Sequence, residues 1–430
     1  MTPDAPPQEH GIAPLPPEPQ GDLTAFQMWA ALGLSLNARN LPDLNEDNVI
    51  RVLTRADALK GRFWFDTFHQ RMMTSWRVPD GAPARALTDT DVSALTIWFQ
   101  RRLELRHLKS KTVDEALKVL GWQNRRSEPV DWMRSLAWDG TPRLEQMLAT
   151  YFGAVDTPYT RAASVNWLVS MVARVMRPGC QVQTMVVLEA GQGRGKSRAL
   201  RALGGPWFSE ATESVQSKDF IIGLQGKLLV EIGEMDAFRG ADVTRIKQVI
   251  SNDNDYYRGP YERRASDHPR QCVFVGTTND DAYLHDHTGG RRFWPVECQR
   301  VDVDGLQADR GQLFAEAVVR YDAGDAWWKM PGTATAREQE ARRQVDEWEH
   351  LIQWHVEHHE DGNARLHPLR TLTVGQVLRE VVKLPAGQWG QREQQRVGRA
   401  LKAMGWSKRQ GGGGVREYVN PAYLEGGADD

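Results

Sequence analysis

Cysteine is scarce in this chain, and both long apolar runs and a strong excess of one charge are missing. The 430 residues include three cysteines, Cys180, Cys272 and Cys298, which are widely spaced and form no CxxC pair. This spacing excludes a disulfide framework and gives no zinc-site pattern. The sequence also lacks a basic-then-apolar leader and any run as long as a membrane span. We therefore expect a cytoplasmic protein with no membrane partner.

The charge balance limits the kind of partner that the chain can bind. Lys and Arg number 54 against 56 Asp and Glu, which gives a formal net charge of −2. A protein that binds nucleic acid over its whole surface would be more basic, so any such contact must be local. Hydrophobic residues make up 40% of the chain, which is enough to bury sizeable cores.

Changes in composition along the chain predict its domains. Residues 1–20 are rich in proline and poor in large apolar groups, so we expect a disordered tail. The rest divides into a helical N-terminal region (21–155), an α/β core (156–330), a charged helical connector (331–365) and a winged-helix-like domain (366–430). In the N-terminal region, Thr112 and Glu115 fit a capping box at the start of a helix.

The core contains three short apolar runs, at 184–188, 227–231 and 271–279, separated by helical patterns. Runs of this length that are apolar on both faces are typical of buried strands in a parallel sheet. The alternation of such strands with helices predicts an α/β fold.

A glycine-rich loop follows the first of these runs and precedes a helix predicted at 196–203. Its residues are Ala190, Gly191, Gln192, Gly193, Arg194, Gly195, Lys196 and Ser197. A strand, a glycine loop and a helix in this order form a phosphate loop, in which backbone N–H groups face the phosphates. Lys196 would reach the β and γ phosphates of ATP, and Ser197 would bind Mg²⁺. Ala190 departs from the pattern, which has glycine there.

Polar residues end the two later apolar runs. Glu231, about 35 positions after Lys196, stands where a Mg²⁺ ligand is expected, and Glu234 could polarise the attacking water. Their roles could be exchanged, because the two acids are not adjacent. Asn279 ends the third run, where an amide can orient the lytic water.

Two further sets of residues indicate a partner subunit and a nucleic-acid strand. Arg291 and Arg292 precede another apolar run, and either could reach a neighbouring subunit's γ phosphate, although surface arginines look the same in sequence. Cations and aromatics alternate between the second and third strands, a mixture that suits single-stranded DNA. The members of this set are Lys247, Tyr256, Arg258, Tyr261, Arg263 and Arg264.

The C-terminal region combines a basic helix with a glycine-tipped hairpin. Arg392, Arg396, Arg399 and Lys402 recur at helical spacing beside an apolar stripe. This pattern predicts a winged helix that contacts duplex DNA. A solvated basic face on a small packing domain is the alternative.

Several segments together resemble the virulence-associated protein E family, over roughly residues 45–300. They are "RSLAWDGTPRLEQML", "EAGQGRGKS", "VEIGEMD", "IKQVISNDNDYYRGPYERR" and "TTNDDAYLHDHTGGRRFWPVE". The resemblance implies a phage or prophage ATPase similar to superfamily 3 helicases, with an AAA+-like core and a hexameric ring on DNA. It makes Lys196 and Ser197 the Walker A pair, Glu231 the Walker B acid, Asn279 sensor 1 and Arg292 the arginine finger. Priming is then expected from a separate primase.

Three functions are compatible with these motifs to different degrees. The first is an ATP-dependent DNA helicase or translocase in replication of a phage or mobile element. The second is an ATP-switched initiator or interference factor that binds DNA without processive unwinding. The third, a small-molecule kinase, lacks a visible acceptor-binding or lid pattern.

Overall fold

A computed structural model describes residues 24–215, 217–234, 240–258, 264–279, 292–342, 346–358, 369–410 and 416–423. The chain forms two compact units, one of Met1–Asn279 with Arg292–Thr335, the other of Asp280–Arg291 with Ala336–Asp430. Each unit has its own hydrophobic core. Among the described residues, no helix is long and apolar enough to cross a membrane.

The N-terminal part of the first unit contains a small sheet as well as helices. Its elements are α1 (Ala25–Leu32), α2 (Glu46–Arg55), β1 (Phe63–Asp66), β2 (Arg71–Thr74), β3 (Arg85–Ala86), α3 (Asp89–Arg102), α4 (Ser110–Gln123) and β4 (Arg125–Arg126). The strands pair in the order β3-β2-β1-β4. Helices make up most of this region, as expected, but the small sheet was not predicted. The predicted capping box was wrong, because α4 begins at Ser110, before Thr112, and has no side-chain cap.

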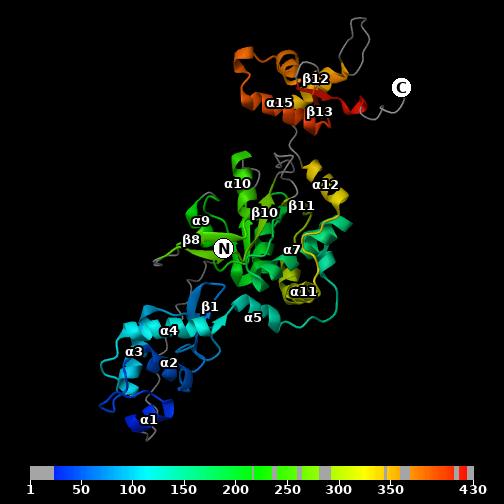
Figure 1. The fold of residues 1–430 in the computed structure, drawn as a ribbon. Coiled ribbons are helices and arrows are strands. Elements are labelled where there is room, and N and C mark those ends of the chain that lie inside the picture. Colours follow the sequence, from blue (N-terminus) through cyan, green and yellow to red (C-terminus); the bar gives the residue numbers. More distant parts are fainter. Residues whose placement is uncertain are drawn as a thin grey trace. The chain divides into compact units, whose positions relative to one another are not determined.

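The centre of the first unit is a five-stranded parallel sheet (Figure 1). Its strands are β5 (Met185–Glu189), β6 (Phe208–Glu210), β7 (Leu229–Ile232), β10 (Val273–Thr278) and β11 (Phe293–Glu297), in the order β11-β5-β10-β7-β6. The three apolar runs are confirmed as strands. The buried side chains of β5, β7 and β10 explain why these runs carry no alternation of apolar and polar residues.

Helices cover this sheet and complete its core. They are α5 (Glu128–Ser135), α6 (Met147–Phe152), α7 (Pro158–Met176), α8 (Lys196–Gly204), α9 (Lys218–Gly223), α10 (Gly240–Ser251) and α11 (Val303–Asp322). Helix α7 packs on β5 and β10, α8 packs on β6 and β7, and α11 packs against both helices. A two-stranded hairpin of β8 (Asn254–Tyr257) and β9 (Ser266–Pro269) stands apart from the sheet.

The second unit pairs helices with a three-stranded antiparallel sheet. After α12 (Gly332–Ala341), which crosses the unit boundary, come α13 (Glu347–Glu357), β12 (Thr371–Thr373), α14 (Val374–Gln376), a π-helical turn (Val377–Val381), α15 (Gln391–Ala403), β13 (Ser407–Gln410) and β14 (Arg416–Val419). The sheet order is β12-β14-β13. Ile352 and Val356 place α13 in this core, so the unit begins before the boundary expected at 366.

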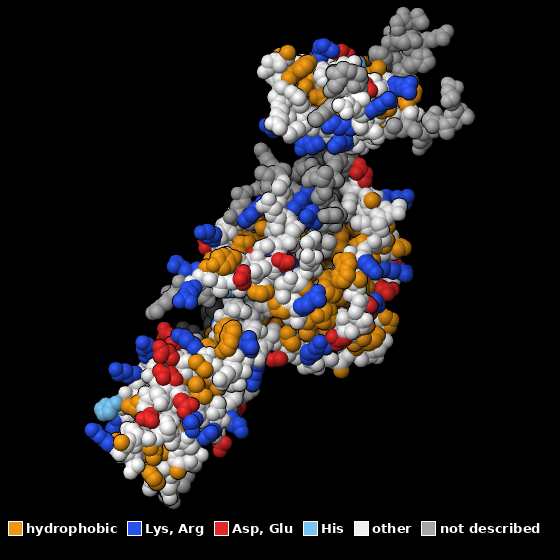
Figure 2. Space-filling view, viewed as in Figure 1, with side chains coloured by type: hydrophobic (Ala, Val, Ile, Leu, Met, Phe, Trp, Pro, Cys, Tyr) orange, Lys and Arg blue, Asp and Glu red, His pale blue; other side chains and the backbone are white. Residues whose placement is uncertain are grey.

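The surface agrees with the balanced composition. On the visible face, Figure 2 shows Lys and Arg side chains in scattered groups among Asp and Glu, without one continuous basic area. This distribution favours local charged contacts over a general attraction to nucleic acid.

Candidate active site

The glycine-rich loop joins the buried strand β5 to the N-terminus of α8. Gly193 and Gly195 adopt left-handed backbone conformations, with φ of 77° and 88°, which side chains other than glycine rarely tolerate. A Cβ built on Gly193 would find no atom within 4 Å, so open space lies above the loop. The N–H groups of the first turn of α8 have no partner within the helix and suit an anion.

Lys196, at the end of this loop, is buried although its side chain carries a charge. Only 8% of the residue is exposed. Its Nζ donates to the carbonyl oxygens of Ala190 and Gly191, and to Asn279 Oδ1 at 3.2 Å. The ammonium is thus held between the first and third predicted motifs, which are 83 positions apart in the chain.

Glu231, on β7, links the start of α8 to the end of β10. Its Oε1 accepts hydrogen bonds from Ser197 Oγ at 2.7 Å and from Thr277 Oγ1 at 2.8 Å. Its Oε2 is buried and has no hydrogen-bond partner in the described residues. A buried carboxylate oxygen without a partner is energetically unfavourable, so this atom is suited to bind a ligand. A hydroxyl and a carboxylate oxygen are ligands that Mg²⁺ takes.

A cavity of about 580 Å³ opens over these groups and brings together six of the eight predicted nucleotide-binding residues, 192–197, while Ala190 and Gly191 do not line it. It is lined by Gln192, Gly193, Arg194, Gly195, Lys196, Ser197, Arg198, Glu210, Ala211, Thr212, Glu231, Gly233, Glu234, Thr277, Thr278 and Asn279. Sequence reasoning missed Thr277 and Glu210. The signal for Thr277 was its place near the end of a buried strand, two residues before Asn279, where a hydroxyl needs a partner.

Glu234 lines this cavity with an unusual backbone conformation. Its φ is 52°, in the left-handed region that glutamate seldom adopts. Strain of this kind clusters at functional sites, where the surrounding structure maintains it. The structure therefore places both predicted acids at the same cavity, Glu231 buried and Glu234 exposed.

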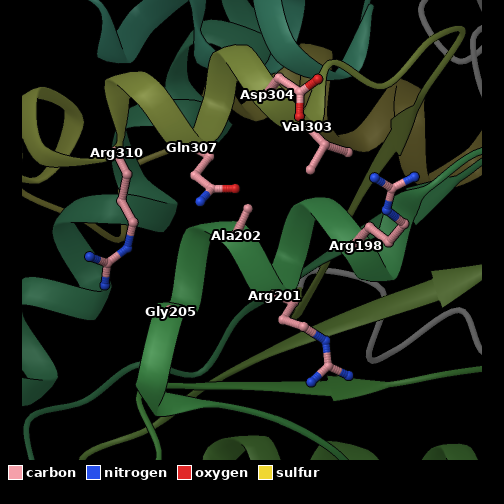
Figure 3. Close-up of a pocket in the computed structure, with 8 residues that line it drawn as sticks. All are labelled: Arg198, Arg201, Ala202, Gly205, Val303, Asp304, Gln307 and Arg310. Atoms are coloured by element: carbon pink, nitrogen blue, oxygen red, sulfur yellow. The ribbon is translucent and has the colours of Figure 1, made fainter. Parts of the chain in front are cut away.

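A second cavity, of about 610 Å³, lies between α8 and α11 (Figure 3). Arg198 lines both cavities, so they adjoin at the first turn of α8. No sequence motif pointed to this cavity, because its residues come from two segments that are about 100 positions apart in the chain.

Arg292, one of the two predicted trans arginines, directly precedes β11. Arg292 is half-buried, and its Nε donates to Ser251 Oγ at 2.7 Å, at the end of α10. Arg291 lies outside the described residues. The structure does not bring Arg292 into the lining of either described cavity.

The hairpin of β8 and β9 presents part of the predicted DNA-binding set. Tyr256 is 71% exposed, and Arg258 and Arg264 are also exposed. At the base, a buried ion pair between Asp255 and Arg270 holds the two strands together. Tyr261 and Arg263 fall outside the described residues.

Lys247 lies apart from the exposed hairpin residues. It is only 9% exposed on α10, and its Nζ lies 5.8 Å from the centre of the Phe293 ring. In this conformation it packs in the interior.

The basic stripe of α15 contains three exposed side chains and one that contacts other residues of the unit. Arg392, Arg399 and Lys402 are exposed. Arg396 instead pairs with Asp346 at 2.8 Å, and its guanidinium carbon lies 4.0 Å from the centre of the Trp348 ring. Partial burial acts to raise the pKa of Asp346, but hydrogen bonds from Arg396 and the Trp348 N–H outweigh it and hold that pKa below its usual range.

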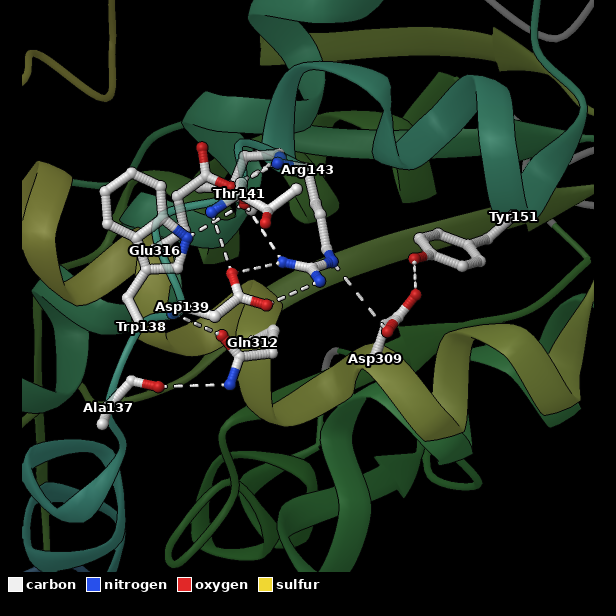
Figure 4. A network of polar contacts seen from close by, with 10 residues as sticks. Ala137, Trp138, Asp139, Thr141, Arg143, Tyr151, Asp309, Gln312 and Glu316 are labelled. Carbon is white, nitrogen blue, oxygen red and sulfur yellow. Dashed lines mark hydrogen bonds and ion pairs between the residues drawn. The ribbon is translucent and has the colours of Figure 1, made fainter.

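The segment "WDGTPR" is anchored to α11 by a network of polar contacts (Figure 4). The Asp139 N–H donates to Gln312 Oε1 at 3.0 Å, and the Arg143 N–H donates to Glu316 Oε2 at 2.6 Å. Within the segment, Arg143 pairs with Asp139 at 2.8 Å. These contacts fix an exposed loop against the helix that walls the second cavity.

The comparisons with known proteins agree with the motifs. The family model of the virulence-associated protein E-like domain matches residues 133–347, half of the chain. The chain belongs to the virulence-associated protein E-like family. The matched virulence-associated protein E-like domain contains the glycine loop, both acids, Asn279 and the hairpin, whereas α15 lies outside it.

Solved structures also match the chain, at low identity. The A-form apo structure of the NrS-1 C-terminal region is 14% identical, with a TM-score of 0.47, and the match covers 88% of this chain and 100% of that one. Another apo structure of that region is 13% identical, with a TM-score of 0.40, covering 83% and 95%. Among curated proteins, none matches the chain.

Proposed function

We propose that this protein is an ATP-dependent DNA helicase or translocase that acts in replication of a phage or mobile element. The observation that carries the proposal is the buried Glu231 carboxylate, which accepts from Ser197 and Thr277 with one oxygen and has no partner for the other among the described residues. This arrangement stands beside a lysine and an open glycine loop. It suits a nucleoside triphosphate with its Mg²⁺, and so a P-loop, AAA+-like ATPase core.

The strand order supports the assignment of roles. Strand β10 lies between β5 and β7, so its carboxyl end carries Thr277 and Asn279 between the loop and Glu231. In open α/β sheets, ligands bind at the carboxyl ends of the strands. The γ phosphate would therefore meet Asn279 and the two acids at the same place.

The proposed mechanism starts from the hydrogen bonds that Lys196 Nζ donates to the loop carbonyls. On nucleotide binding, β- and γ-phosphate oxygens would replace the backbone carbonyls as acceptors of its ammonium protons. When bound, Mg²⁺ would neutralise phosphate charge, held by Ser197 and by Glu231 directly or through water. Glu234 would take the proton of the attacking water, while Asn279 orients it. Arg292 of a neighbouring subunit would stabilise the charge that develops on the γ phosphate.

DNA binding is proposed at two places. The exposed Tyr256, Arg258 and Arg264 on the β8–β9 hairpin would grip a single strand in the centre of a homo-hexameric ring. In the second unit, the order of helix, strand, two helices and paired strands supports the expectation of a winged helix, in which α15 would contact duplex phosphates. Replication by such a ring would need a separate primase.

Mixing two defective proteins tests this function and its dependence on neighbouring subunits. Each of the Lys196→Ala and Arg292→Ala proteins should fail to displace a strand from forked DNA. If the arginine acts in trans, mixed rings restore part of the ATP hydrolysis, since some interfaces combine an intact loop with an intact arginine. Mass photometry with ATP should show hexamers. ATP-dependent oligomers that hydrolyse slowly and never displace a strand would instead indicate the initiator or interference function.

A further inference from the structure

The proposed site would hold the triphosphate of ATP. The cavity between α8 and α11 adjoins that site and lies where the attached nucleoside would be. Its volume of about 610 Å³ falls within the range of roughly 300–1,000 Å³ usual for small-molecule sites. It adjoins the phosphate cavity at Arg198, the residue after Ser197. One ligand could therefore occupy both cavities.

The direction of the phosphate chain points to this second cavity. Glu231, Thr277 and Asn279 mark the cleavage end, on the side of β7 and β10. Strand β11 flanks β5 on the opposite side, and α11 follows it. A Cβ on Gly195 would lie 3.9 Å from Val303 Cγ2, so the start of α11 abuts the loop. The nucleoside end of the chain would leave the loop toward α11.

We propose that the cavity between α8 and α11 binds the purine base and ribose of ATP, an inference that rests on the proposed ATPase function. Gln307 and Val303 reach from α11 toward α8, where Ala202 and Arg198 lie (Figure 3). Val303 and Ala202 offer apolar contact to a ring, and the Arg198 guanidinium can stack on its face.

Polar groups for the edge of the base come from α11. The Gln307 amide supplies one donor and one acceptor, which match the N6 and N7 groups of adenine. Asp304, one turn earlier, can accept from an exocyclic amine. Within the described part of the chain, neither of these side chains has a hydrogen-bond partner, so both are available to a ligand.

The other two arginines of the cavity are fixed by the protein itself. Arg310 donates to the Leu203 carbonyl at 2.8 Å, and its guanidinium carbon lies 4.1 Å from the centre of the Trp132 ring. Arg201 pairs with Glu210 at 2.8 Å. These contacts stabilise the walls of the cavity. Gln307 and Asp304 would then make the hydrogen bonds that recognise the base.

Calorimetric titration of the full-length chain with MgATP, MgCTP and magnesium tripolyphosphate tests the assignment. Wild type should bind ATP more tightly than CTP or tripolyphosphate. Gln307→Ala should weaken ATP binding roughly fivefold to tenfold, the effect of one hydrogen bond. Ala202→Phe, which fills the cavity, should bring ATP affinity down to that of tripolyphosphate. Tripolyphosphate affinity should stay unchanged in both variants, which also shows that they are folded.

The controls separate this inference from the proposed function. Asp325→Ala, an acid beyond the far end of α11, should bind all three ligands as wild type does. ATP affinity unchanged in both Gln307→Ala and Ala202→Phe would overturn the nucleoside site while leaving the phosphate site intact. Wild type that binds neither ATP nor tripolyphosphate would overturn both.

Discussion

The carboxyl edge of the central sheet and the exposed face of α15 both gather charged side chains, but they hold them differently. At the sheet edge, Glu231 is 3% exposed and Lys196 is 8% exposed, and each contacts groups from distant segments. On α15, Arg392, Arg399 and Lys402 are exposed, and only Arg396 is held in place.

Burial explains the difference. A buried charge without partners is strongly unfavourable, so the residues around Glu231 must adopt one arrangement. An exposed cation is solvated in many rotamers, so its position is set only when a ligand binds. The two regions should therefore respond to mutation in different ways.

The largest effect is expected at the buried carboxylate. Glu231→Gln keeps the shape of the side chain but removes its charge, so ATP hydrolysis should fall roughly 100-fold or more. Phosphate release at saturating ATP measures this. Glu210→Gln is the matched control, since Glu210 lines the same cavity but pairs with Arg201, and it should change the rate by less than about threefold. Equal losses in both variants would contradict a special role for Glu231.

A smaller effect is expected where a neutral group orients the same carboxylate. Thr277→Val removes the hydroxyl that donates to Glu231 at 2.8 Å but keeps a similar volume. The loss of one hydrogen bond should lower hydrolysis roughly fivefold to tenfold. If Thr277 acts only through Glu231, combining Thr277→Val with Glu231→Gln should add little. Additive losses would show that Thr277 has another role.

The sequence predicted much of this edge because burial constrains it. The apolar runs that became β5, β7 and β10 have the length of buried strands, and the loop stands between a strand and a helix. The contact between Thr277 and Glu231 could not be predicted, because a strand's neighbour depends on sheet order. The N-terminal sheet was missed since its strands are two to four residues long, too short for a periodic pattern.

The sequence predicted the basic stripe of α15. It could not show which of these cations would be exposed and which would pair with another residue. Arg396 occurs at the same helical spacing as the exposed cations, yet Asp346 and Trp348 engage it. These partners lie on α13 and its N-cap, and no periodicity links them to α15.

Measurements of duplex DNA binding should distinguish the three exposed cations of α15 from Arg396, which pairs with Asp346. The triple variant Arg392→Ala, Arg399→Ala and Lys402→Ala should weaken duplex binding severalfold. It should also reduce the slope of log affinity against log salt by roughly 0.9 for each phosphate that the variant no longer neutralises. Arg396→Ala is the control and should leave the slope unchanged. Equal slopes in wild type and the triple variant would favour a solvated face that does not touch DNA.

The smallest effect is expected from the ion pair that holds Arg396. Arg396→Ala should lower the stability of the second unit by about 1 kcal/mol, because it removes both the ion pair and the stacking on Trp348. Because the folded state lowers the pKa of Asp346, this stabilisation is present above its usual value of 3.8 and is lost as pH falls through the folded-state pKa. Amide hydrogen exchange in α15 measures both changes. The difference between wild type and Asp346→Asn should be present at pH 6 and shrink as the pH falls below 3.8, and a constant difference would contradict the assignment.

The central claim is that the glycine loop binds a triphosphate whose cleavage is coupled to DNA. Release of phosphate from ATP, with and without single-stranded DNA, tests it most directly on wild type and Lys196→Ala. We predict hydrolysis by wild type that DNA stimulates, and a loss of roughly 100-fold or more in Lys196→Ala, which still binds DNA. Intact wild-type protein that releases no phosphate with any DNA, or a Lys196→Ala protein that hydrolyses as wild type does, would contradict the claim.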